Sequence, residues 1–293
     1  MEYFKKSIEK GIFTMKQITK RKVKAFREYL IDEEKSEATV SKYLHDVTVF
    51  YDWLNDRALE KNIVVEYKKK ICEEYAPASV NAMLSSLNCF FAFCGWHDLR
   101  VKSLRIQRQI FASTEKELTK AEYERLLNAA RSKKNERLFL LMQTICSTGI
   151  RVSELKFITV EALERGIAEI SCKGKRRQVF IPKELRRMLG QYLREQKIKS
   201  GSVFVTKNGN PLDRSNIWSD MKKLCRMANV SEKKVFPHNL RHLFARTYYS
   251  LQKDVVRLAD ILGHSSVNTT RIYTMESGVV HRRQMEKLGL LRC

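Results

Sequence analysis

Residues 237–242 read Pro-His-Asn-Leu-Arg-His. Pro237 is typical of the first turn of a helix, where its missing N–H has no intrahelical partner to lose. On that helix His238, Arg241 and His242 follow i, i+3 and i+4 spacing, so they share one face. A single histidine at such a position is more often a capping or core residue. Two histidines around one arginine indicate instead a site that binds an anion.

Two other stretches hold residues suited to the same anion. Leu262-Gly263-His264 follows a predicted helix, and Tyr273 comes nine residues after its histidine. A tyrosine placed in this way is a candidate nucleophile. Residues 147–155 read Ser-Thr-Gly-Ile-Arg-Val-Ser-Glu-Leu, where the glycine ends an apolar helix and Arg151 follows the turn. By itself Arg151 would be interpreted as a surface residue beside a loop.

A basic β-hairpin is predicted between residues 166 and 181. Gly166–Cys172 and Gln178–Ile181 are short and partly β-branched, and the sequence Lys-Gly-Lys-Arg-Arg lies between them. Such a turn is either a solvated surface or a contact to a nucleic-acid backbone. Its charged residues are Lys173, Lys175, Arg176 and Arg177.

The first part of the chain is expected to form a helical domain. Apolar residues recur there with the 3.6-residue period of amphipathic helices. Pro77 is expected to break the chain before the last helix, and Ser79 to cap that helix. The four helices are expected at 16–34, 40–54, 63–74 and 80–94.

A second domain is expected because a chain of 293 residues exceeds the usual domain size of roughly 100–150. Thr119 and Glu122 form a capping box that starts its first helix. We place an N-terminal helical domain at 1–106, a linker at 107–116 and the second domain at 117–293. Apart from the hairpin, its elements are expected at 119–130, 138–147, 153–157, 185–195, 216–228, from 237, 255–262, 267–273 and 279–290, with a short strand at 203–205.

The formal net charge of +23 lies mostly in the second domain. Residues 1–112 carry 20 Lys and Arg against 15 Asp and Glu, a net +5, and residues 113–293 carry 36 against 18, a net +18. This excess favours a polyanion as partner. No stretch approaches the ~20 apolar residues that span a bilayer, and the N-terminus does not resemble a signal peptide. We therefore expect a cytoplasmic location and no membrane partner. The seven cysteines include no Cys-x-x-Cys pair, which argues against a zinc site or a disulfide framework.

Together and in this order, these stretches resemble the tyrosine recombinase family, also called the phage integrase family. The second domain resembles it by motif, and the first is similar to its core-binding domain by helical pattern. We expect no arm-binding domain before Ile18, and therefore a build nearer to Xer-like two-domain members than to lambda-type integrases. The resemblance implies a mainly α fold with a small β-hairpin. It combines an N-terminal four-helix core-binding domain with a C-terminal α+β catalytic domain.

The resemblance also implies a role for each motif residue. Arg151 and Arg241 would clamp the phosphate that is cut, and Tyr273 would be the nucleophile. His238 would assist as general base, and His264 would donate to a phosphate oxygen. The general acid is expected to be Lys173, with Lys175 as the competing choice, the supporting residue is Glu154, and contacts to DNA are expected of Lys175, Arg176 and Arg177.

The implied function is site-specific DNA recombination through a 3′-phosphotyrosyl intermediate, without a cofactor or a metal ion. The expected partner is double-stranded DNA with specific recombination sites. Monomers in solution would assemble into a tetramer at synapsis, with the helix at 279–290 docking on a neighbouring protomer. Two alternatives stay open, a type IB topoisomerase-like enzyme and a catalytically silent DNA-binding regulator. The sequence specifies neither the target site nor whether the outcome is integration, excision, inversion or dimer resolution.

Overall fold

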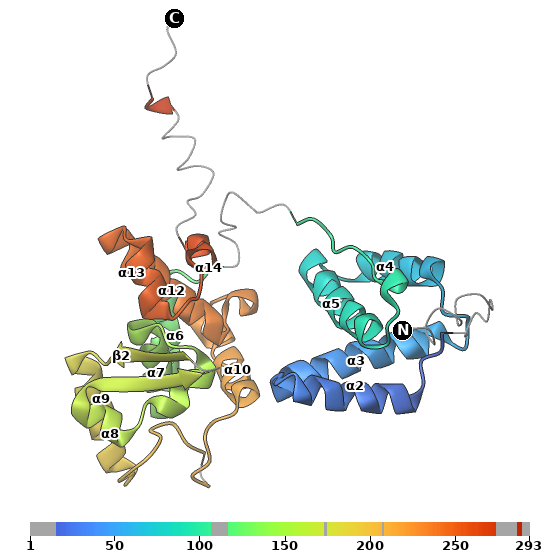
Figure 1. Ribbon diagram of the computed structural model, residues 1–293. Helices are drawn as coiled ribbons and strands as arrows, with labels where there is room; N and C mark the ends of the chain where they lie inside the picture. The colour runs from blue at the N-terminus through green and yellow to red at the C-terminus, as the bar shows by residue number, and fades with distance from the viewer. Residues whose placement is uncertain (1–15, 107–116, 173–174, 207, 274–285, 289–293) are drawn as a thin grey trace, which may run out of the picture. The chain divides into compact units, whose positions relative to one another are not determined.

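The computed structural model describes residues 16–106, 117–172, 175–206, 208–273 and 286–288. The chain divides into two compact units, Met1–Arg108 and Gln109–Cys293 (Figure 1). The predicted linker at 107–116 lies outside the described residues. Within the described ranges, no helix is both long enough and apolar enough to cross a membrane.

The first unit is a four-helix domain, as predicted. The side chains of Thr19 and Ser36 accept hydrogen bonds from the first turns of the first two helices, which fixes where these helices begin. Two predicted helix starts are wrong. The first helix begins at Lys20 rather than at residue 16, because Thr19 is its N-cap. Pro77 is the first residue of its helix, because a proline fits the first turn, and Ser79 lies inside that helix. The elements are α2 (Lys20–Asp32), α3 (Glu37–Leu54), α4 (Lys61–Glu74), α5 (Pro77–Phe93) and the 3-10 helix η1 (His97–Leu99).

Aromatic side chains form the centre of this domain. The ring centroid of Phe50 lies 4.9 Å from that of Tyr67 and 5.9 Å from that of Phe91. The rings of Phe26 and Phe90 pack in a T-shaped pair with centroids 5.2 Å apart. These five side chains are at most 1% exposed. Each such pair adds about 0.5–1.5 kcal/mol beyond the burial of its area. The four helices are therefore joined by one continuous core.

In the second unit α7 is the central helix. Most of its residues are buried, and it contacts α6, α9, α10 and α12. The predicted capping box is confirmed at the start of α6, where Thr119 and Glu122 satisfy each other's backbone N–H groups. In chain order the elements are α6 (Lys120–Ser132), α7 (Glu136–Thr148), η3 (Val152–Phe157), α8 (Val160–Arg165), β1 (Ile167–Cys172), β2 (Lys175–Phe180), α9 (Lys183–Glu195), α10 (Arg214–Lys222), α11 (Cys225–Ala228), η4 (Glu232–Lys234), α12 (Pro237–Gln252), α13 (Val255–Leu262), α14 (Val267–Thr270) and η5 (Arg271–Tyr273).

The structure departs from the predicted elements of this unit at several places. The helix expected at 216–228 is two helices, because the N–H of Leu224 bonds to the carbonyl of Met221, three residues back, in a tighter turn. The strand expected at 203–205 is reduced to isolated bridges, since its backbone pairs with single residues rather than with a partner strand. Helix α8 was not predicted, and the final helix expected at 279–290 falls almost wholly outside the described residues.

The basic hairpin forms, but its second strand is longer than predicted. β1 and β2 pair antiparallel from Ile167 opposite Phe180 to Cys172 opposite Lys175. β2 therefore begins at Lys175 rather than at Gln178, because the ladder continues through the basic residues. Residues 173 and 174, which join the strands, lie outside the described residues. Arg176 and Arg177 are thus strand residues whose side chains leave opposite faces of the sheet.

Candidate active site

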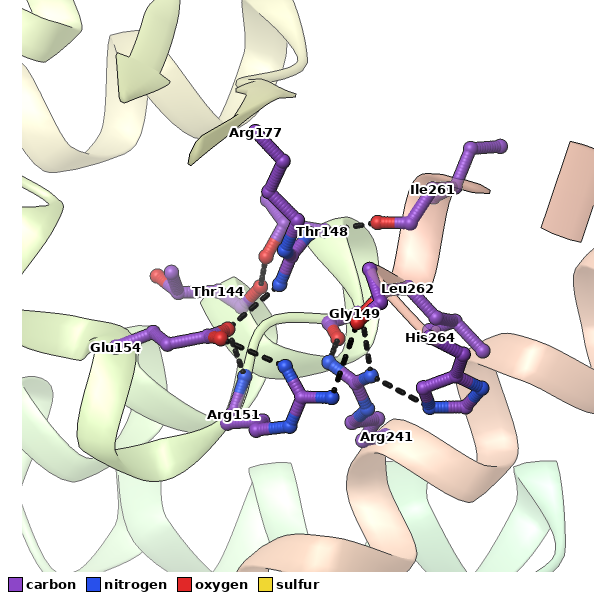
Figure 2. A network of polar contacts seen from close by, with 11 residues as sticks. Thr144, Thr148, Gly149, Arg151, Glu154, Arg177, Arg241, Ile261, Leu262 and His264 are labelled. Atoms are coloured by element: carbon purple, nitrogen blue, oxygen red, sulfur yellow. Dashed lines mark hydrogen bonds and ion pairs between the residues drawn. The ribbon is translucent and has the colours of Figure 1, made fainter. Parts of the chain in front are cut away.

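Arg241 is the most buried charged side chain of the second unit. It projects from α12 and is 1% exposed. Its guanidinium donates to the carbonyl oxygens of Gly149 at 2.6 Å and of Leu262 at 2.7 Å, and it lies 3.1 Å from Nε2 of His264 (Figure 2). Burial lowers its pKa to about 10, so that it keeps its charge at neutral pH. One cation therefore joins three segments that are distant in the sequence.

Glycine ends both of the helices that Arg241 contacts. α7 ends at Gly149 with φ of 67°, and α13 ends at Gly263 with φ of 65°, a region that side chains with a Cβ rarely adopt. The two helix ends turn their last carbonyl groups toward Arg241. Because the C-terminus of a helix carries partial negative charge, both ends stabilise the guanidinium.

Arg151 follows the first of these turns and is held by Glu154. The carboxylate of Glu154 is 2% exposed, and it accepts from Nη1 and from the backbone N–H of Arg151, each at 2.8 Å. The Arg151 side chain is 41% exposed. Its Nη2 lies 3.5 Å from the carbonyl oxygen of Gly263, beside the turn that also holds Arg241. The structure thus brings the two predicted clamp arginines together, with Arg151 open to solvent.

His264 has both ring nitrogens engaged. Because a guanidinium only donates, Nε2 accepts from Arg241, and we infer that Nδ1 carries the proton and donates to Oγ1 of Thr270 at 2.8 Å. Burial and the charge of Arg241 lower the pKa of His264 to about 4, which makes the ring neutral at pH 7. In this arrangement His264 orients Arg241. To donate to a phosphate, as its motif predicts, the ring has to exchange one of these partners.

Tyr273 packs beside this group of residues and is only 4% exposed. Its ring stacks on that of His264 at a centroid distance of 6.1 Å and meets the edge of His242 at 4.7 Å. Burial raises the pKa of Tyr273, while the charge of Arg241 and a hydrogen bond with it oppose that rise. The predicted nucleophile is therefore a protonated phenol next to the predicted clamp.

His242 is a residue that the motif assignment missed. It lies between His238 and Tyr273, with ring centroids 4.5 Å and 4.7 Å away. Burial lowers its pKa to about 4. His238, the predicted base, reaches the solvent. The protein atoms around its ring and the positive charges of Arg241 and Arg151 lower its pKa as well. The i+4 spacing placed both histidines on one face of the predicted helix, but the family motif gave a role only to His238.

The basic residues of the hairpin divide into two groups. Arg176 is exposed, and it lines an open cleft of about 630 Å³ together with Arg151, Arg177 and His264. The guanidinium of Arg177 points inward and donates to Glu154 at 2.6 Å. Lys173 lies outside the described residues, so its predicted role as general acid stays a prediction. The cleft is large enough for a phosphate group and has cations on several sides.

The two half-buried histidines, His242 and His264, predict how stability depends on pH. Both rings have a pKa of about 4 in the folded protein, against about 6.5 for an unfolded chain. Between these values the unfolded chain binds more protons, so the free energy of unfolding falls as the pH is lowered from 6.5 toward 4. We expect thermal denaturation at fixed ionic strength to show this fall. The double variant H242Q/H264Q should lose less stability over the same range. Parallel curves for the two proteins would contradict the interpretation.

Comparison with known proteins gives matches to both units. Residues 116–278 match the family described as "Phage integrase family", and residues 23–97 match "Phage integrase, N-terminal SAM-like domain". Tyrosine recombinase XerA of Thermococcus kodakarensis is 30% identical over 280 residues, which cover 92% of this chain and 95% of the relative. Tyrosine recombinase XerD of Vibrio cholerae is 27% identical over 259 residues, which cover 82% and 86%.

Solved structures have the same fold. A XerH site-specific recombinase bound to difH substrate in a pre-cleavage complex matches with a TM-score of 0.66 and 21% identity, covering 86% of this chain and 79% of that one. A lambda integrase dimer bound to a COC' core site matches with a TM-score of 0.71 and 18% identity, covering 94% and 86%. At these identities the likeness is one of fold.

Proposed function

Because the chain belongs to the phage integrase family and is a site-specific tyrosine recombinase, we propose that it cuts and rejoins DNA by attack of Tyr273 on a phosphodiester. The observation that carries this proposal is the position of Arg241. Its buried guanidinium joins the ends of α7 and α13, and its positive charge opposes the rise that burial causes in the pKa of Tyr273. A nucleophile and a cation suited to the phosphate that it attacks therefore lie side by side.

Two arginines supply the electrostatic part of the reaction. As the phenol oxygen attacks, negative charge builds on the two non-bridging oxygens of the phosphate. Guanidinium groups can bind such oxygens through paired N–H donors. Arg151 and Arg241 both reach the turn at residues 262–263, so their guanidinium groups converge on one place. Removing one preorganised donor of this kind costs about 10²–10³ in rate.

The proton transfers involve other groups. The bond from phosphorus to the Tyr273 oxygen forms while the bond to the 5′ oxygen breaks. Burial raises the pKa of Tyr273, so the phenol has to give up its proton during the attack. His238, whose pKa is lowered, is neutral at pH 7 and serves as the proposed base. Lys173, or else Lys175, would protonate the 5′ oxygen. The products are a 3′-phosphotyrosine and a free 5′-hydroxyl.

Strand exchange follows from the energy kept in this covalent link. A 5′-hydroxyl from another strand can attack the phosphotyrosine in the reverse direction, so the scheme consumes no ATP. Tyr273 is only 4% exposed. We therefore propose that DNA binding moves Tyr273 outward to the phosphate. The same step would let His264 exchange its contact with Arg241 for one with a phosphate oxygen.

The proposed partner is double-stranded DNA that carries specific recombination sites. The basic second half of the chain supports a polyanion partner. A lambda integrase tetramer bound to a Holliday junction matches this chain with a TM-score of 0.70 and 18% identity, covering 86% of this chain and 76% of that one. By analogy we propose a monomer in solution that assembles into a tetramer on two sites. Its substrate would place it in the cytoplasm.

Covalent trapping tests this function. The protein is mixed with DNA fragments that flank its own gene, quenched with detergent and separated on a denaturing gel. An adduct whose strands exchange only when two matching sites are present supports the recombinase. If the protein forms an adduct and relaxes supercoiled DNA that carries no paired sites, it would be a topoisomerase-like enzyme. Binding in a mobility-shift assay with no adduct on the bound fragments would indicate a catalytically silent regulator.

A further inference from the structure

Arg177 is a half-buried charge that the proposed chemistry does not use. Its side chain is 14% exposed, and it lies on the inner face of the hairpin, where Ile170 is its partner on β1. Nη2 donates to Oε2 of Glu154 at 2.6 Å, and Nη1 donates to the carbonyl oxygen of Ile261 at 2.6 Å (Figure 2). One side chain thus links β2 to the segment after α7 and to the end of α13.

Through Glu154, Arg177 acts on the first clamp arginine. Oε1 of Glu154 accepts from the Arg151 guanidinium, and Oε2 accepts from the Arg151 backbone and from Arg177. The carboxylate is therefore held from two sides, and its orientation fixes where Arg151 points. A buried carboxylate that loses one of two cationic partners keeps its desolvation cost and becomes free to rotate.

Through Ile261, Arg177 acts on the turn that holds the second clamp arginine. The next carbonyl along the chain, that of Leu262, accepts from Arg241. The Arg177 side chain also packs over Gly263, where an added Cβ would lie 2.4 Å from its Cδ atom. The position of Arg177 and the course of this turn therefore depend on each other.

We propose that Arg177 is a positioning residue that holds strand β2 against the two segments that carry Glu154 and Ile261, and so fixes the two arginines of the clamp relative to each other. The inference rests on the proposed function. Burial lowers the pKa of Arg177, but its pairing with Glu154 opposes this effect. Such a buried ion pair is costly to break by removing one partner. The expectation from the sequence that Arg177 contacts DNA is replaced here by a role inside the protein, while Arg176 keeps that expectation.

The test compares R177M with R187M. Arg187 also pairs with a glutamate, Glu184, but its side chain is 66% exposed on α9. For each variant we would measure DNA affinity and the single-turnover rate of adduct formation at saturating DNA. Misplacing reacting groups by about 1 Å can cost 10²-fold in rate. We therefore expect R177M to form adduct about 10²-fold more slowly, with the DNA affinity of the wild type. R187M should match the wild type in both measurements.

Two further variants separate positioning from DNA contact and from loss of folding. R176M should weaken DNA binding and reduce its salt dependence, which is the signature of a phosphate contact. If R177M behaves in that way, Arg177 is a DNA-binding residue and the proposal is wrong. R177K keeps the charge but has one ammonium group for two acceptors, so it should fold and still cut slowly. Wild-type rates for R177K would overturn the proposal.

A double-mutant comparison tests whether Arg177 acts through Glu154. In an E154Q background, R177M should cost much less than it costs alone, because the contact that it removes is already weakened. Additive losses would contradict the coupling. Failure of the underlying function is distinguishable from all these outcomes, since it would appear as the absence of adduct in the wild-type protein.

Discussion

Replacing Tyr273 with phenylalanine is expected to abolish the covalent adduct while DNA binding is retained. The Tyr273 ring is buried against the rings of His242 and His264, and phenylalanine keeps those contacts. Only the hydroxyl is lost. Arg241 still has the carbonyl oxygens of Gly149 and Leu262 as acceptors, so the clamp keeps its place. Loss of a covalent nucleophile removes on the order of 10⁶ in rate in a well-studied hydrolase, which puts any remaining adduct below detection.

The measurement is detergent-quenched trapping, with a mobility-shift assay on the same fragments. Tyr248 supplies a matched control, because it lies on the same helix as Arg241, stacks on Phe244 at 6.1 Å and packs against the same apolar cluster as Tyr273. Y248F should form adduct at the wild-type rate. An adduct that persists in Y273F would show that another side chain carries the DNA and would remove the central assignment.

Much of the fold could be predicted because its signals are local. α13 begins and ends at the predicted residues, Val255 and Leu262, since Asp254 caps its start and Gly263 ends it. The Thr119 capping box is equally local. The strand at 203–205 and the helix at 216–228 were wrong for a different reason. The strand depends on which distant backbone groups it meets. The helix is divided by a tighter local turn at Leu224, which its apolar spacing does not reveal.

The inward position of Arg177 in the hairpin was not predicted from its charge. Arg177, Val179 and Ile181 alternate with exposed residues, and this period of two was a signal that Arg177 faces inward. A run of four positive charges obscured it, because a basic run is usually a solvated face. The family motif likewise indicated which residues form the site. It could not indicate that Tyr273 and Arg241 are buried together, because burial arises from the packing of α12 against α7 and α13.

Replacing Arg241 with lysine is expected to reduce cleavage by about 10²–10³-fold or more, the cost of removing one preorganised donor to a charged transition state. Arg241 uses separate N–H groups for Gly149, Leu262 and His264. A lysine places one ammonium group in that space. It cannot span the ends of α7 and α13 and also present a pair of donors to a phosphate. Lysine is preferred to alanine here, because alanine would leave two carbonyl groups and a cavity buried at a site that is 1% exposed.

The control for R241K is the same substitution at Arg246, on the same helix. Arg246 is paired with Glu117 and donates to the carbonyl oxygen of Leu118 at 2.8 Å, away from the clamp. R246K should lower thermal stability without changing single-turnover cleavage at saturating DNA. R241K should reduce cleavage even at temperatures where denaturation curves show it fully folded. If R241K cuts as fast as R246K, charge alone is sufficient at this position. The paired donors of Arg241 would then have no part in catalysis, and the transition-state clamp would have to be assigned to Arg151 alone.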